Sequence, residues 1–153
     1  MDFFDSGRRD GAPSLSRLLA EAAMARAALG SCPCPIAILD AASPSRPVAY
    51  LNDAFEEMFG IRAQEAIGKA LGALVFRGDE ALVHRMLAES AFSKPVRAWS
   101  KDGTPRPVTL SLGALRDRDG RVTHWVASFA DRSEAEKLQA ELDAMRAPAA
   151  KAA

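Results

Sequence analysis

The sequence lacks an excess of charge of either sign, and it lacks long apolar runs. Its 153 residues contain 20 Lys and Arg against 20 Asp and Glu, so the formal net charge is zero. This balance argues against nucleic-acid binding, which depends on positive charge facing the phosphates. No apolar stretch approaches the roughly 18–20 residues of a membrane span, and the polar N-terminus has no apolar signal core. We therefore expect a cytoplasmic protein without membrane insertion.

The sequence is also poor in residues that bind metals or carry out catalysis. It has two cysteines and two histidines. Cys32 and Cys34 are separated by a single residue, which is too close for an unstrained disulfide, and neither histidine stands at a zinc-finger spacing from them. No phosphate-binding loop, dinucleotide-binding glycine motif or paired carboxylate motif is present. We predict that the protein is not an enzyme and has no metal site.

Apolar residues are abundant enough for one hydrophobic core. They make up 48% of the chain, whose length suits a single domain with appendages. The pattern predicts a disordered start, an amphipathic helix, a core domain, a coiled-coil-like helix and a tail, at residues 1–13, 14–30, 33–131, 132–147 and 148–153.

The first helix carries an apolar seam. Ser14 is predicted to cap it and Gly30 to end it. Along one side, apolar residues recur at alternating steps of three and four: Leu15, Leu18, Ala22, Ala25 and Leu29. Such a seam favours contact with a second helix. The same stripe could instead lie on the domain's own sheet, and both interpretations can hold in part.

Five strands are predicted from alternating apolar residues and turn signals, at residues 35–40, 47–51, 94–100, 105–116 and 121–130. Short helices separate the second strand from the third, and the longest is expected at Asp79–Phe92. In the fourth strand Val108, Leu110 and Leu112 share a face. In the fifth, either of two alternating sets could face the core: Val122, His124, Val126 and Ser128, or Thr123, Trp125, Ala127 and Phe129.

The last helix is predicted to begin with a capping box, in which the Ser133 hydroxyl and the Glu136 carboxylate bind open amides. A short coiled-coil seam follows at Ala135, Leu138, Leu142 and Met145, and Pro148 is expected to end it. A helix of about 14 residues is marginal alone, so we predict that it needs a partner surface and that the protein is a homodimer. The Ala/Lys tail favours a stand-alone single-domain protein.

Five short motifs, in order, resemble those of the PAS family between Pro35 and about Leu142. They are Asn52-Asp53-Ala54-Phe55, Gly68-Lys69, Lys101-Asp102-Gly103-Thr104, Arg118-Asp119-Gly120 and Asp131-Arg132-Ser133-Glu134. The resemblance implies an α+β PAS fold, in which a five-stranded antiparallel sheet carries short helices on one face and amphipathic helices flank the core. It also implies that Asp131 marks the exit of a signal into the terminal helix.

Within that family the sequence is most similar to the LOV flavin photoreceptors, which carry a G-x-N-C-R-F-L-Q helix. Here that helix is matched by residues 68–75, where Leu71 replaces the reactive Cys and Ala70 and Val75 replace the polar Asn and Gln. Val108, Leu110 and Phe129 stand where LOV domains have flavin-binding amides. Adduct formation needs a thiol and a buried flavin edge needs polar partners. We therefore predict that flavin is not bound.

The resemblance leaves two roles open for such a domain. The first is a non-catalytic interaction module, whose implied partners are a second copy and a PAS-containing sensor histidine kinase in bacterial two-component signalling. The second is a sensor of a colourless small ligand, in a pocket lined by Leu71, Val75, Leu87, Val108, Leu110 and Phe129. Haem is a lesser alternative, since haem-binding PAS domains use a central-helix histidine and His84 lies there, although off the apolar stripe.

Overall fold

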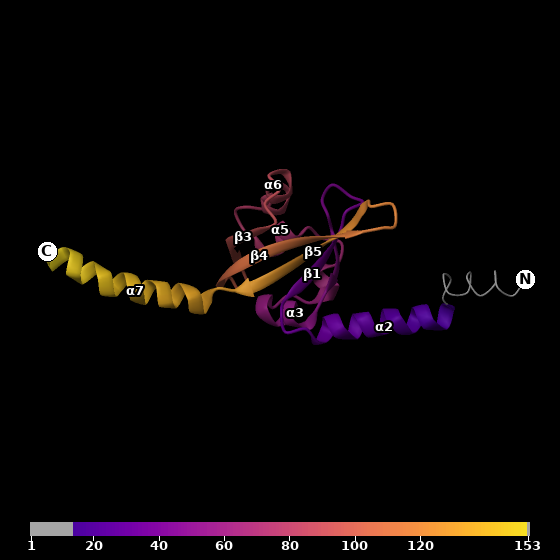
Figure 1. Ribbon diagram of the computed structural model, residues 1–153, viewed down its shortest axis with the longest axis horizontal. Helices are drawn as coiled ribbons and strands as arrows, with labels where there is room; N and C mark the ends of the chain where they lie inside the picture. Colours follow the sequence, from indigo (N-terminus) through magenta and orange to yellow (C-terminus); the bar gives the residue numbers. More distant parts are fainter. Residues whose placement is uncertain (1–13, 153) are drawn as a thin grey trace, which may run out of the picture.

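The computed structural model describes residues 14–152, without the side chains of residues 147–152. Residues 1–13, for which we predicted disorder, lie outside the described part. The elements in chain order are α2 (Leu15–Ser31), β1 (Ile36–Asp40), β2 (Val48–Leu51), α3 (Asp53–Phe59), α4 (Ala63–Ala66), α5 (Leu71–Val75), α6 (Leu82–Ala88), β3 (Ser93–Trp99), β4 (Pro105–Arg116), β5 (Val122–Asp131) and α7 (Ser133–Ala152) (Figure 1).

The five strands form one antiparallel sheet in the order β2-β1-β5-β4-β3. Every strand boundary agrees with the sequence prediction to within one residue. The predicted turn between β4 and β5 is present, and the Asp117 carboxylate accepts hydrogen bonds there from the amides of Asp119 and Arg121 at 2.9 and 3.0 Å. The α+β fold expected from the resemblance is confirmed.

One face of the sheet carries the core. On β4 the predicted face is buried at Val108, Leu110 and Leu112, whereas on β5 the buried residues are Ala127 and Phe129. Of the two alternatives for β5, the set with Phe129 therefore faces the core. Four phenylalanine rings meet over the middle of the sheet, with centroids 4.7–6.2 Å apart: Phe55, Phe59, Phe76 and Phe129.

The predicted long central helix is wrong in length, because α6 spans only Leu82–Ala88. Ser90 adopts a left-handed conformation at φ +54°, and the next amide, of Ala91, donates to the Met86 carbonyl at 2.8 Å. This pattern ends a helix by satisfying its last carbonyls. The expectation failed because serine at such a position is not marked by its residue type in the way that glycine is.

The start and end of α7 also differ from the expectation. Ser133 is the first helical residue, and its amide donates to the Asp131 carboxylate at 2.8 Å, so Asp131 takes the capping role expected of Ser133. The backbone continues to Ala152 instead of ending at Pro148. Proline lacks one amide donor, and the alanines around it are strong helix formers that offset this loss.

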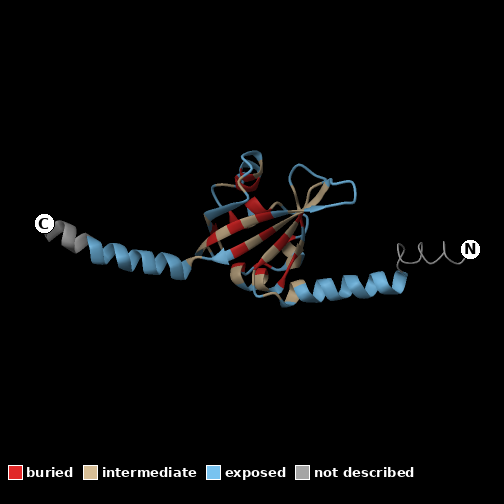
Figure 2. Cartoon of the chain, viewed as in Figure 1, coloured by how far each residue is buried: buried red, intermediate tan, exposed pale blue. Residues whose placement is uncertain are grey.

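The helices α2 and α7 project from the core in opposite directions (Figure 1). No residue of α2 is buried, and α7 is exposed throughout its described side chains (Figure 2). The interpretation in which the α2 stripe lies on the domain's own sheet is therefore wrong, apart from the half-buried Leu29 at the junction. Among the described residues, no helix combines the length and apolar character needed to cross a membrane.

Candidate functional site

The residues predicted to line an inner pocket do come together in space. Leu71 and Val75 lie on α5, Val108 and Leu110 on β4 and Phe129 on β5, and each is at most 2% exposed. The sixth residue, Leu87, is half-buried and packs against the margin of this core. Together with the phenylalanine cluster, these side chains occupy the space between the sheet and the short helices.

This interior contains few polar side chains. Among the described residues the buried polar side chains are Asn52 and Ser100. The Ser100 hydroxyl lies 3.0 Å from the Asp102 carboxylate and 3.2 Å from the Thr104 carbonyl, so the turn between β3 and β4 satisfies it. A flavin ring edge carries several donors and acceptors that are costly to bury unpaired. Both side chains already have partners within the fold, and the buried side-chain nitrogen left without a partner among the described residues, Arg106 Nε, can only donate. No amide side chain faces the ring positions at Val108, Leu110 and Phe129, so the residues present do not fit a flavin.

The start of α5 is closed against the segment before α6. A Cβ atom added to Gly72 would lie 2.0 Å from the carbonyl oxygen of Glu80, and 2.7 Å from its carbonyl carbon. The same position is occupied by Arg in the G-x-N-C-R-F-L-Q motif. A side chain of any kind at this position would require the Glu80 backbone to move.

Asn52 joins the N-terminal helix to the core, a role that the sequence did not reveal beyond a possible helix cap. Its side-chain oxygen accepts from the amides of Ile36 at 2.9 Å and Phe55 at 3.0 Å. Its side-chain nitrogen donates to the carbonyls of Leu29 at 3.1 Å and Cys34 at 2.8 Å. With all four bonds made and 1% exposure, one side chain holds the end of α2, the start of β1 and the start of α3.

Asp131 lies where β5 passes into α7, as the resemblance implied for a signal exit. Hydrogen bonds from Ser133 hold the pKa of the Asp131 carboxyl below its usual value, and the charge of Arg106 adds to this. The next residue fixes the joint to the sheet, because the Arg132 amide donates to the Pro107 carbonyl at 2.8 Å. Since the folded pKa is lowered, the ionised carboxylate stabilises this joint above the unfolded pKa, and this contribution is lost as the pH falls through the folded value.

The predicted seams are largely uncovered. On α2 the exposed members are Leu15, Leu18, Ala22 and Ala25, and on α7 they are Leu138, Leu142 and Met145. Leu15 is 71% and Met145 76% exposed. Isolated exposed apolar residues are ordinary, but a helical row of them along a projecting helix is a surface on which a partner helix can pack.

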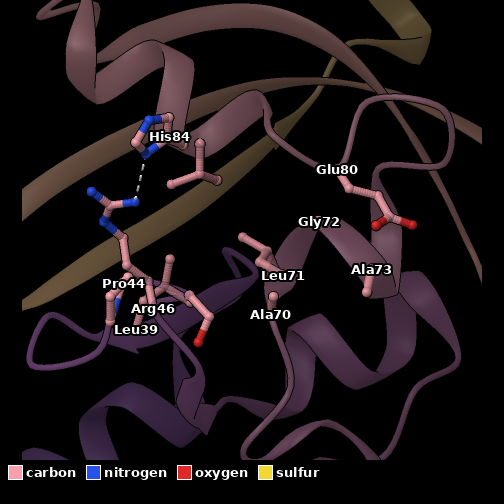
Figure 3. Close-up of a pocket in the computed structure, with 11 residues that line it drawn as sticks. Leu39, Pro44, Arg46, Ala70, Leu71, Gly72, Ala73, Glu80 and His84 are labelled. Carbon is pink, nitrogen blue, oxygen red and sulfur yellow. Dashed lines mark hydrogen bonds between the residues drawn. The ribbon is translucent and has the colours of Figure 1, made fainter.

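His84 does not point into the core. It is exposed, and its Nδ1 lies 3.5 Å from a guanidinium nitrogen of Arg46, on the outer side of α6 (Figure 3). A haem ligand must reach an interior large enough for the macrocycle. The position of His84 therefore gives the haem alternative no support.

The chain belongs to the PAS family, because residues 23–132 match the PAS fold. It is 30% identical over 124 residues to the bacterioopsin transcriptional activator of Halobacterium salinarum, covering 78% of this chain and 18% of that protein. It is 28% identical over 110 residues to a blue-light-activated histidine kinase of Brucella anthropi, covering 69% of this chain and 22% of that protein. The chain thus spans about a fifth of the length of these relatives.

Solved structures of light-oxygen-voltage proteins share this fold. An RNA-binding light-oxygen-voltage receptor superposes with a TM-score of 0.70 at 21% sequence identity, covering 92% of this chain and 41% of that one. The fold and the matches define a PAS domain of the LOV-like kind, related to sensor kinases and other regulators.

Proposed function

We propose that this protein is a non-catalytic PAS interaction module that works through protein–protein contacts and forms a homodimer. The observation that carries the proposal is the pair of exposed seams, one on each helix that projects from the core. Burying one leucine or methionine side chain stabilises an assembly by about 1.5–3 kcal/mol. Several such side chains along a seam can therefore offset the cost of association.

The outer face of the sheet extends this surface. Ile36 and Ile38 on β1 lie beside Ser128 and Val126 on β5, and these four side chains face away from the core and are half-buried. None of these four side chains is charged, so a second copy could cover the patch at a small desolvation cost. The patch lies on the two strands that are joined to the flanking helices, since β1 follows α2 and β5 precedes α7.

The partner that we propose besides a second copy is a PAS-containing sensor histidine kinase, in bacterial two-component signalling in the cytoplasm. The similarity to a blue-light-activated histidine kinase supports this class of partner. In this proposal a contact made on the sheet reaches α7 through Asp131, whose carboxylate caps the helix directly after the strand. The protein would then regulate or dock to the kinase through its helices.

The seam on α7 can be tested by one change of charge. Leu138→Asp should reduce the light-scattering mass from twice to once the 16.3 kDa of one chain, because a carboxylate buried between helices costs several kcal/mol. Ala140→Asp is the matched control, since Ala140 is exposed two residues along the same helix and faces the opposite side. Its mass should stay that of the dimer.

A dimer that survives both Leu138→Asp and the corresponding α2 change, Leu18→Asp, would contradict the proposal that the seams form the dimer.

The kinase contact can be tested with a bacterial two-hybrid assay against PAS-containing sensor kinases, using the same Leu138→Asp and Ala140→Asp pair. Loss of the signal in the first variant alone is expected. Equal signals in both variants would remove α7 from that contact.

We further propose that the interior binds no flavin, and the buried apolar side chains of Val108, Leu110 and Phe129 support this. The alternative function is a sensor of a colourless ligand among Leu71, Val75, Leu87, Val108, Leu110 and Phe129, and the lesser one is a haem sensor through His84. Purified protein mixed with excess FMN and then desalted is expected to show no visible absorption. A flavin absorption band would contradict the proposal. A Soret band in the untreated protein would favour haem, and a bound mass in native mass spectrometry would favour the colourless ligand.

A further inference from the structure

An outer pocket of about 230 Å³ lies between the β1–β2 loop and the helices α5 and α6, away from both seams. Its apolar floor is made by Leu39, Leu71 and Val83. Arg46 and His84 stand at one side of it, 38 residues apart in sequence and 3.5 Å apart in space (Figure 3). Of the six residues predicted to line the interior, only Leu71 also lines this pocket.

The Arg46–His84 contact has a defined donor and acceptor. A guanidinium has five donors and no acceptor, so in this contact Arg46 donates and the Nδ1 atom of His84 accepts. Among the described residues, no carboxylate forms an ion pair with Arg46. Arg46 is half-buried, and its guanidinium keeps donors besides the one that faces His84.

The backbone at Arg46 points to a role for its side chain. Its φ of +48° is in the left-handed region, which glycine adopts without strain and other residues adopt at a cost. An arginine at such a position bears this cost and places a cation beside an apolar floor. Strained positions of this kind gather at binding sites.

One acidic residue also lines the pocket. Glu80 contributes to the wall, but its carboxylate lies across the start of α5 from Arg46 (Figure 3). The cationic and acidic groups are therefore at opposite sides, and the field near Arg46 favours an anion.

We propose that the outer pocket binds a small organic anion, a carboxylate with a compact aromatic or branched apolar tail. The carboxylate would receive paired hydrogen bonds from Arg46, as guanidinium groups bind carboxylates in a fork, next to the His84 ring. The tail would cover Leu39, Leu71 and Val83. A buried cavity of about 150 Å³ holds benzene, so the size of this pocket suits a ligand of that order.

Benzoate is a suitable probe, and His124 serves as an internal control for His84. In NMR titrations the His84 ring signals should shift with a Kd in the millimolar range, whereas those of His124, which lies on β5 outside the pocket, should stay in place. Benzyl alcohol, which keeps the ring but not the charge, should bind at least tenfold more weakly. Inorganic phosphate, which keeps charge but has no tail, should also bind at least tenfold more weakly.

Arg46→Gly is the decisive variant, because glycine relaxes the backbone at this position while it removes the guanidinium. It should fold with an unchanged or higher melting temperature and lose at least tenfold in benzoate affinity, as should Arg46→Gln. Benzoate binding of equal strength in these variants would overturn the proposal. So would equal shifts of His84 and His124, phosphate binding as tight as benzoate binding, or no benzoate binding to the unaltered protein.

Discussion

Gly72→Ala is expected to lower the free energy of unfolding by about 3 kcal/mol or more, at the upper end of what overpacking costs. The added methyl group would lie 2.0 Å from the Glu80 carbonyl oxygen, a distance at which the atoms overlap. Neither side can yield easily, because the obstacle is backbone and not the end of a flexible side chain. The melting temperature should fall by roughly 10 °C in thermal unfolding followed by circular dichroism.

Gly113→Ala is the matched control for this substitution. Gly113 lies on β4, and a Cβ atom added there meets nothing within 4 Å. Because alanine restricts the unfolded chain more than glycine does, this variant should be as stable as the original or slightly more stable. A Gly72→Ala protein that unfolds at the same temperature as Gly113→Ala would show that the α5–α6 joint is looser than described.

The Gly72 contact also bears on the cofactor. A LOV-type pocket places a long side chain at this position, and here the backbone of Glu80 closes on the glycine instead. Restoring a thiol alone, as in Leu71→Cys, should therefore not restore flavin binding. The apolar side chains at Val108, Leu110 and Phe129 would still leave the polar edge of the ring without partners.

Asn52→Ala is expected to cost about 3–5 kcal/mol, because it removes four hydrogen bonds at once and leaves the partner amides and carbonyls without replacements. The side chain is 1% exposed, so water cannot take over these bonds without opening the joint. The change also removes the cap of α3, whose Phe55 amide bonds to Asn52 at 3.0 Å. Urea unfolding with tryptophan fluorescence would measure the loss.

Asp53→Ala is the neighbouring control, since Asp53 is exposed and is the first residue of the same helix. It should change stability by less than about 1 kcal/mol. Hydrogen exchange adds a local test: in Asn52→Ala the amides at the C-terminal end of α2 should exchange faster relative to those of β4. Parallel stability losses in both variants, with unchanged exchange in α2, would contradict the role of Asn52 as the joint.

Much of the fold could be read from local pattern. The alternation of Val108, Leu110 and Leu112 fixed one face of β4, and the turn residues around Gly120 fixed where β4 and β5 meet. These signals are local, because strand periodicity and turn chemistry depend on residues close in sequence. The exposed seams of the two flanking helices were also visible as periodic apolar residues.

Other features needed the tertiary structure. The length of α6 depended on a left-handed serine, and the capping of α7 depended on which of two adjacent polar residues reached the open amide. The burial of Phe129 decided between two alternating sets that both mix apolar and polar residues in the sequence. In each case competing local signals were of similar strength, so packing chose between them.

By itself the sequence determined a PAS sheet and two amphipathic flanks, and it predicted an interior without flavin-binding residue types. Only the tertiary structure decided that Asn52 joins α2 to the core, that Gly72 meets Glu80, and that Arg46 meets His84 beside an apolar floor. The physical reason is that these contacts join residues from separate elements. Periodicity describes which face of an element is apolar, whereas the partner across the gap is set by how the elements pack against one another.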